Sequence, residues 1–316
     1  MSVSILVTRK LPSSVLDKLR AVAELDVYTG EAAIPPAELR TRVAGKDALV
    51  SLLTDAVDKP VIDAGSRLKV IANVAVVFNN IDVAHARSRG IVVTNTQDVL
   101  TESVADFTWA LMLSITRRLA EGERLLRRGE WKGWALGFML GTELRGKQLG
   151  LVGVGRIGRA VAARAPAFGM KVAYTSRSDV RLPDAESMSL DRLLLTSDVV
   201  SLHVPLTPET RHLIDRRALT RMKRSAYLIN TARGPVVDEE ALAWALQQHL
   251  LAGAALDVYE REPEVHKDLL KLENALLVPH LASGTTETRT AMADLAAENV
   301  LAVLAGRPPI TPVGRP

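Results

Sequence analysis

The stretch that decides the fold is residues 150–158, Gly-Leu-Val-Gly-Val-Gly-Arg-Ile-Gly, which carries the GxGxxG spacing. The residues on either side predict a short buried strand over 148–152 and an Ala-rich helix over 159–167. A strand, a glycine turn and a helix N-terminus together offer backbone N–H groups to a pyrophosphate. The alternative is an ordinary tight turn, but both flanking elements match, so we favour a dinucleotide site. Its expected residues are Gly153, Gly155, Arg156, Ile157 and Gly158.

Composition narrows the class of protein. The chain has 316 residues, which favours two domains, and it is 47% hydrophobic and 24% charged, as in globular proteins with a sizeable core. It has no cysteine, which excludes disulfides, thiolate metal ligands and cysteine nucleophiles and fits a cytoplasmic location. Its 40 basic and 36 acidic residues give a net charge of +4, and the basic residues are scattered along the chain, so we expect no nucleic-acid partner. The first apolar run, 3–7, is too short for a signal peptide, and no run suggests a membrane span.

Strand and helix patterns alternate twice along the chain. The first hundred residues predict strands over 4–8, 24–28, 48–52, 69–74 and 91–94. A long helix is expected over 101–128, and a last helix over 285–304, which is free to return to the first unit. Between them, strands are expected over 148–152, 171–175, 198–203, 226–230, 253–258 and 275–278. Alternation of this kind predicts an α/β fold with two doubly wound parallel sheets.

The end of the second strand of the glycine-turn unit bears on cofactor choice. An acidic residue near this point binds the ribose hydroxyls of NAD. Here the strand is followed by Ser176, Arg177 and Ser178, and Asp179 comes too late, in the turn. A carboxylate would repel a 2′-phosphate, whereas serine and arginine can hydrogen-bond it and supply charge. We therefore expect NADP(H) to be preferred, with NAD(H) possible; the alternative is a solvated loop arginine.

Three later strand ends carry polar residues that could do chemistry. They bring Arg233 after the strand ending at 230, Glu262 in the segment 257–263, and His280 in the segment 278–283. Ligands bind at such strand ends in open α/β sheets, so the three predict an anion clamp and a carboxylate–imidazole pair for proton transfer. Any one alone would read as a surface arginine, a loop glutamate or a histidine at a strand end.

With these motifs the chain resembles the D-isomer-specific 2-hydroxyacid dehydrogenases over almost its full length, and within them it is most similar to the glyoxylate/hydroxypyruvate reductases. The motifs that carry the resemblance are Gly153–Gly158, Ser201–Thr207, Thr231–Gly234, Asp257–Pro263 and Pro279-His280. The resemblance implies a Rossmann-like cofactor domain over 100–285, inserted in a flavodoxin-like substrate domain formed by 1–99 and 286–316. It further implies NADPH-dependent reduction of small 2-keto acids such as glyoxylate and hydroxypyruvate to D-2-hydroxy acids.

The resemblance also implies the roles of individual residues. Arg233, Glu262 and His280 fall on the catalytic positions. The substrate-binding positions are Val76, Val77, Arg233 and Ser283. The remaining cofactor-binding positions are His203, Val204, Pro205, Thr210, Thr231, Ala232, Asp257, which holds the nicotinamide amide, and His280. No metal-ligand spacing occurs in the sequence.

The sequence leaves some alternatives open. The family loop that aligns with 75–80 usually has glycine where this chain has Val77. Within the family, an NAD-dependent 3-phosphoglycerate dehydrogenase is the alternative, although the short tail leaves no room for a regulatory domain. In another class, a non-catalytic nucleotide-sensing protein would keep the glycine motif without turnover.

The apolar segment 131–140 and the resemblance together predict a homodimer built on the cofactor domain.

Overall fold

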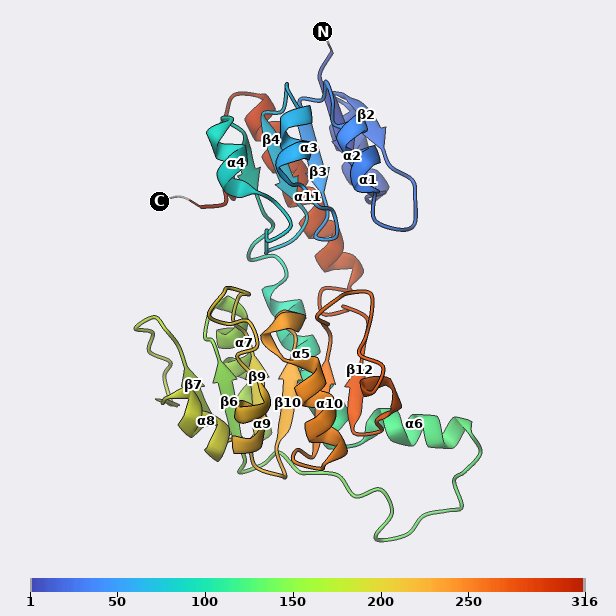
Figure 1. The fold of residues 1–316 in the computed structure, drawn as a ribbon, viewed down its shortest axis with the longest axis vertical. Coiled ribbons are helices and arrows are strands. Elements are labelled where there is room, and N and C mark those ends of the chain that lie inside the picture. Colours follow the sequence, from blue (N-terminus) through green and yellow to red (C-terminus); the bar gives the residue numbers. More distant parts are fainter. Residues whose placement is uncertain (1, 315–316) are drawn as a thin grey trace. The chain divides into compact units, whose positions relative to one another are not determined.

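The structure, a computed structural model, describes residues 2–314, which form two compact units (Figure 1). The first unit comprises the residues up to Leu100 and those from Thr285 onward, and the second comprises Thr101–Gly284. Each unit contains one sheet whose strands all run parallel. The expected α/β fold with two doubly wound parallel sheets is confirmed. None of the described helices has the length and hydropathy that crossing a membrane requires.

The first unit has a five-stranded sheet in the order β2-β1-β3-β4-β5, which is the flavodoxin-like order. The long C-terminal helix α11 packs against β3, β4 and α1, so the end of the chain completes the unit that the N-terminus begins. The strands are β1 (Ser4–Val7), β2 (Glu24–Val27), β3 (Ala48–Ser51), β4 (Val70–Asn73) and β5 (Val92–Thr94). The helices are α1 (Ser13–Arg20), α2 (Pro36–Arg42), α3 (Lys59–Ala64), α4 (Val83–Ser88) and α11 (Thr286–Leu304).

The second unit has a seven-stranded sheet in the order β12-β11-β10-β9-β6-β7-β8. The order reverses between β6 and β9, and the crevice outside such a reversal is where doubly wound folds bind ligands. The strands are β6 (Gln148–Val152), β7 (Lys171–Thr175), β8 (Ala185–Ser187), β9 (Val199–Leu202), β10 (Tyr227–Asn230), β11 (Gly253–Leu256) and β12 (Ala275–Leu277). The helices are α5 (Thr101–Thr116), α6 (Leu119–Arg127), α7 (Arg156–Arg164), α8 (Leu190–Thr196), α9 (Arg216–Arg221) and α10 (Glu239–Gln247), with short 3-10 turns at Ala165–Phe168, Gly234–Val236 and Leu269–Lys271.

Both faces of this second sheet are buried. Leu228 of β10 packs in the cluster formed with α8, α9 and α10, whereas its neighbours Tyr227 and Ile229 pack in the cluster formed with α5 and α7. Figure 1 shows α9 and α10 on one face of the sheet and α5 on the other. Strands covered on both faces need apolar residues at every position, which explains why these strands read as continuous apolar runs.

The prediction of a single helix over 101–128 is wrong, because this stretch forms two helices, α5 and α6. The Thr116 carbonyl accepts a hydrogen bond from the Thr142 N–H (2.7 Å), and Arg118 then takes a left-handed conformation with φ 54°. A Cβ on Gly141 would lie 2.5 Å from the same carbonyl, so the return of the chain at Gly141 stops the helix there. The helix after the glycine turn begins at Arg156, earlier than expected, and the short, polar strand β8 was not predicted.

Candidate active site

The glycine turn between β6 and α7 brings two backbone segments into close contact. Gly153 has φ +93°, and a Cβ on it would lie 2.7 Å from the His203 carbonyl oxygen. A Cβ on Gly158 would lie 2.4 Å from the Gly153 carbonyl oxygen. The first and third glycines of the motif are therefore needed for a strained turn and for packing of the helix on the strand.

The middle glycine differs, because a Cβ on Gly155 would meet no atom within 4 Å. Gly155 is exposed, is the N-cap of α7, and has no side chain capping the helix. The turn thus presents open space in front of a helix N-terminus whose first N–H groups point outward, as a pyrophosphate requires. The residues of this segment, with Arg156 and Ile157 in the first helical turn, fit a dinucleotide.

Ser176, Arg177 and Ser178 follow β7 directly and are exposed at the same edge of the sheet. The Ser178 N–H donates to the Ser176 hydroxyl (3.3 Å), which folds this segment into a turn. A hydrogen bond with Thr207, together with the positive charge of Arg177, lowers the pKa of Glu209. The charge of Arg177 therefore acts on Glu209, in the segment that follows β9.

The segment after β9 is held by its own hydrogen bonds. The imidazole of His203 lies 2.9 Å from the Ser201 hydroxyl, and burial lowers the pKa of His203 to about 4, so the ring is neutral near pH 7. The Thr210 hydroxyl donates to the Pro205 carbonyl (2.6 Å) and accepts from the Thr207 N–H (2.8 Å). In this structure the Thr210 side chain therefore shapes the loop, and Val204 and Pro205 lie within it.

Arg233 follows β10 and is brought to the segment after β11 by the glycine beside it. A Cβ on Gly234 would lie 1.9 Å from the carbonyl carbon of Tyr259, so only glycine allows this approach of two backbones. Burial lowers the pKa of Arg233, while the charge of Glu262 opposes that shift. Thr231, beside Ala232 in the same turn, is buried and lies 3.0 Å, hydroxyl to hydroxyl, from Thr108 of α5.

Glu262 and His280 form an ion pair in which Glu262 Oε2 lies 2.8 Å from His280 Nδ1. The Tyr259 N–H donates to the other carboxylate oxygen of Glu262 (3.1 Å). Burial would raise the pKa of Glu262, but the hydrogen bond and charge of His280, with the charge of Arg233, bring that pKa below its usual value. Because Nδ1 is held by Glu262, the ring nitrogen Nε2 is the one left to meet a ligand. The three side chains expected to act together are thus neighbours.

Asp257 holds the segment that carries His280. It is fully buried, and its carboxylate accepts from the Ala282 N–H (2.9 Å) and from the Leu281 N–H, while its own carbonyl accepts from the His280 N–H (2.9 Å). His280 has φ 52°, in the left-handed region, and these bonds support that conformation. Burial raises the pKa of Asp257.

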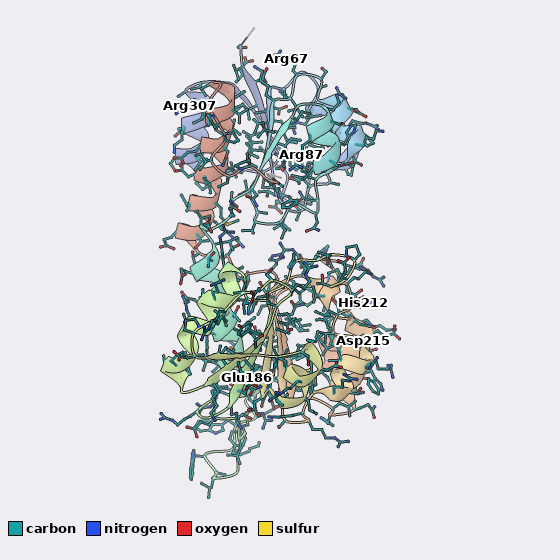
Figure 2. All side chains as sticks on the ribbon, turned by 90° about the vertical axis from the view of Figure 1, so that its left-hand side faces the viewer. Arg67, Arg87, Glu186, His212, Asp215 and Arg307 are labelled. Carbon is teal, nitrogen blue, oxygen red and sulfur yellow. The ribbon has the colours of Figure 1, made fainter. Side chains whose placement is uncertain are left out.

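A second histidine–carboxylate pair lies beside the site and was not expected from the sequence. His212, labelled in Figure 2, lies 2.9 Å from Glu260, and Glu260 accepts from the Glu239 N–H (3.1 Å). Buried Glu239 in turn accepts from the N–H groups of Glu260 and His266, at the two ends of the turn that carries Glu262. In the sequence, Glu239 is only an acidic residue in the first turn of a helix, a position that many exposed residues share. The sequence alone therefore could not distinguish Glu239 from them.

The remaining predicted residues lie elsewhere. Ser283 is half-buried next to Ala282, at the end of the second unit. Val76 and Val77 belong to the first unit, in the loop that follows β4, where both are half-buried. Val77 does not have a positive φ, so this loop accommodates valine in an ordinary backbone region. Among the residues described, no group of three or more acidic or histidine side chains is arranged to hold a metal ion.

Comparison with known proteins agrees with this geometry. Residues 109–282 match the family described as D-isomer specific 2-hydroxyacid dehydrogenase, NAD binding domain. A glyoxylate reductase of Thermofilum pendens is 49% identical over 312 residues, which cover 96% of this chain and 92% of that protein. A crystal structure of a protein from Thermus thermophilus has a TM-score of 0.95 at 49% identity, covering 98% of this chain and all of that one.

One further crystal structure shows ligands. An NADPH-dependent glyoxylate/hydroxypyruvate reductase from Sinorhizobium meliloti, in complex with NADP and malonate, has a TM-score of 0.87 at 36% identity and covers 99% of this chain and 97% of that one. The chain therefore belongs to the D-isomer-specific 2-hydroxyacid dehydrogenases. It is an NAD(P)-dependent oxidoreductase, and its second unit contains the residues that match the NAD-binding domain of the family.

Proposed function

We propose that the protein reduces small 2-keto acids, glyoxylate and hydroxypyruvate among them, to 2-hydroxy acids of D configuration with NADPH. The observation that carries this proposal is the pair of Glu262 and His280, 2.8 Å apart and beside Arg233, in the unit that contains the glycine turn. The glyoxylate reductases of the same family, at 49% identity in one case, support the substrate class. Here the second unit is the dinucleotide-binding domain and the first is the substrate-binding domain.

Each side chain then has a defined task. The bound nicotinamide cofactor supplies the hydride that adds to the keto carbon. His280, held at Nδ1 by Glu262, gives the proton at Nε2 to the keto oxygen as negative charge develops there. Arg233 binds the substrate carboxylate and stabilises that developing charge. Glu262 stabilises the protonated imidazole and fixes the orientation of its ring.

The backbone N–H groups of Val76 and Val77 provide further contacts to the substrate carboxylate, and Ser283 is a further substrate-binding residue. The test is to assay a panel of keto acids with NADPH. We expect glyoxylate and hydroxypyruvate to give the highest kcat/KM, and the product of hydroxypyruvate reduction to be the D enantiomer. Oxidation or reduction confined to phosphorylated substrates, or an L product, would refute this function. Binding of NADPH with no turnover of any keto acid would instead favour a nucleotide-sensing protein.

The preference for NADPH rests on Ser176, Arg177 and Ser178 as donors to the 2′-phosphate. The backbone at 203–205 and 231–232 lines the rest of the cofactor, and Asp257 lies beside the nicotinamide amide. Arg177→Asp is expected to weaken NADPH far more than NADH, because it replaces a charge-assisted hydrogen bond with repulsion. Arg181→Asp, the same charge change at an exposed position of the following segment, is the control. Equal losses of NADPH and NADH in Arg177→Asp would show that Arg177 does not bind that phosphate.

The assembly we propose is a homodimer formed through the segment 131–140. Trp134 and Leu136 are each 82% exposed and Leu140 is 68% exposed, which is unusual for large apolar side chains that stay in water. A second copy of the chain would bury them. Light scattering at micromolar concentration should give the dimer mass, and Trp134→Ser with Leu136→Ser should lower it. A monomeric wild-type protein would contradict this assembly.

A further inference from the structure

Two buried asparagines hold the loop after β4 in the first unit. The Asn95 amide donates to the Val76 carbonyl, and the Asn73 amide donates to the Val77 carbonyl, each at 2.7 Å. Asn73 is fully buried and Asn95 is 6% exposed, so these are not solvent-competed contacts. The two bonds therefore fix the two successive peptide groups on either side of Val77.

Fixing both peptide groups fixes the backbone of Val77 itself. Both peptide bonds are trans, so each N–H points away from the carbonyl of the same peptide group. With the Val76 carbonyl turned toward Asn95, the Val77 N–H must point away from Asn95. No oxygen among the described residues accepts from that N–H. Because φ and ψ are the only soft torsions of a residue, Val77 has little freedom left.

The asparagines are themselves held in place. The Asn73 side-chain oxygen accepts from the Ser51 hydroxyl (3.2 Å), and the Asn80 amide lies within hydrogen-bond distance of the same oxygen (3.4 Å). The Asn95 carbonyl accepts from the Thr311 hydroxyl, and its N–H donates to the Thr311 carbonyl (3.2 Å). The side chain of Asn73 and the backbone of Asn95 are thus held in place, which helps to pre-organise the two amide donors.

We propose that Asn73 and Asn95 are positioning residues for substrate binding: they lock Val77 in the conformation that presents its N–H to the substrate carboxylate. The inference rests on the proposed function, in which that N–H is a substrate contact. Valine can serve at a position where glycine is usual, because Val77 does not have a positive φ.

The test uses Asn73→Leu and Asn95→Leu, which keep roughly the size of each side chain and remove the amide donor without adding a charge. The control is Asp47→Ala, which changes a buried polar residue at the opposite end of the same sheet. Asp47 pairs with Arg67, which is labelled in Figure 2, and accepts from the Ser4 N–H (3.0 Å). For each variant we would measure the melting temperature, kcat and KM for glyoxylate, and the Kd of NADPH. We would also measure the Kd of oxamate, a non-reducible keto-acid analogue, by calorimetry with NADPH present.

Losing one oriented donor to a carboxylate should raise KM and the oxamate Kd about tenfold in each asparagine variant. The NADPH Kd should stay the same, and kcat should change much less than KM. Asp47→Ala should lower the melting temperature without raising KM. If the asparagine variants bind oxamate as tightly as wild type, or if Asp47→Ala raises KM equally, the inference is wrong.

Two further readouts separate this inference from the proposed function. A wild-type protein that binds oxamate but reduces no keto acid would refute the function, and the oxamate Kd would still test the asparagines. Should the leucine variants not fold, the amide resonance of Val77 in ¹⁵N-labelled wild-type protein must shift when oxamate is added. An unmoved Val77 resonance at saturating oxamate would overturn the inference.

Discussion

Replacing Gly155 and Gly158 separately by alanine should separate cofactor binding from folding. The Cβ of Gly158→Ala would lie 2.4 Å from the Gly153 carbonyl oxygen and 3.2 Å from its carbon, and both are backbone atoms that cannot rotate away. The helix and the strand must move apart, which costs about 3 kcal/mol, at the upper end of overpacking. For a unit of this size, that is a fall in melting temperature of roughly 6–12 °C.

Gly155→Ala has no such cost, because its Cβ would meet nothing within 4 Å and its φ of −67° suits any residue. Its methyl group would instead stand where the pyrophosphate approaches. We expect the melting temperature of Gly155→Ala to stay within about 1 °C of wild type or to rise slightly, because alanine restricts the unfolded chain. The NADPH Kd should nevertheless rise about tenfold or more, through lost hydrogen bonds to charged oxygens.

Differential scanning fluorimetry and fluorescence titration of NADPH measure both effects on the same samples. The reasoning would be refuted if Gly155→Ala bound NADPH as tightly as wild type, since the open space before α7 would then not be the phosphate site. It would be refuted equally if Gly158→Ala were as stable as wild type.

Three further outcomes are expected. Glu262→Gln should move the pH profile of reduction about one unit toward lower pH, because the carboxylate that favours protonated His280 is lost; an unmoved profile would exclude this role. The burial of Asp198 is outweighed by hydrogen bonds from the Gln148 N–H and Lys223, which lower its pKa below the ordinary value of 3.8, so Asp198→Asn should cost about 2 kcal/mol near pH 7. The cost should shrink as the pH falls below that ordinary value and through the lower pKa of the folded carboxylate; a pH-independent difference in urea unfolding would contradict this. Val77→Gly should lower KM for a branched keto acid more than for glyoxylate, and an unchanged ratio of kcat/KM values would show that Val77 does not shape the pocket.

Much of the fold could be predicted because both sheets are parallel and buried. Such strands are apolar along their whole length, so the runs at 148–152 and 226–230 stood out, and the glycine spacing placed the turn between β6 and α7. The break between α5 and α6 could not be predicted, because it depends on the Thr142 N–H reaching the Thr116 carbonyl from a later segment. A long-range contact of this kind leaves no local pattern.

The candidate site divides in the same way. The motifs identified Arg233, Glu262 and His280, and the structure places them together. The contacts that hold these three residues in place could not be predicted. Gly234 packs against the Tyr259 backbone, and the carboxylate of Asp257 accepts hydrogen bonds from the two N–H groups after His280. Those contacts join different strand ends, so they are properties of the folded sheet and have no signature in spacing or composition.

The account depends most on proton transfer at His280. The measurement that tests it most directly is the rate of NADPH oxidation by glyoxylate in His280→Asn, together with the NADPH Kd on the same protein. Asparagine keeps a polar side chain of similar size near Glu262 but cannot deliver a proton, so the account predicts a fall in kcat of at least about a hundredfold with NADPH binding nearly unchanged. A His280→Asn variant that reduces glyoxylate at a rate near that of wild type would contradict it.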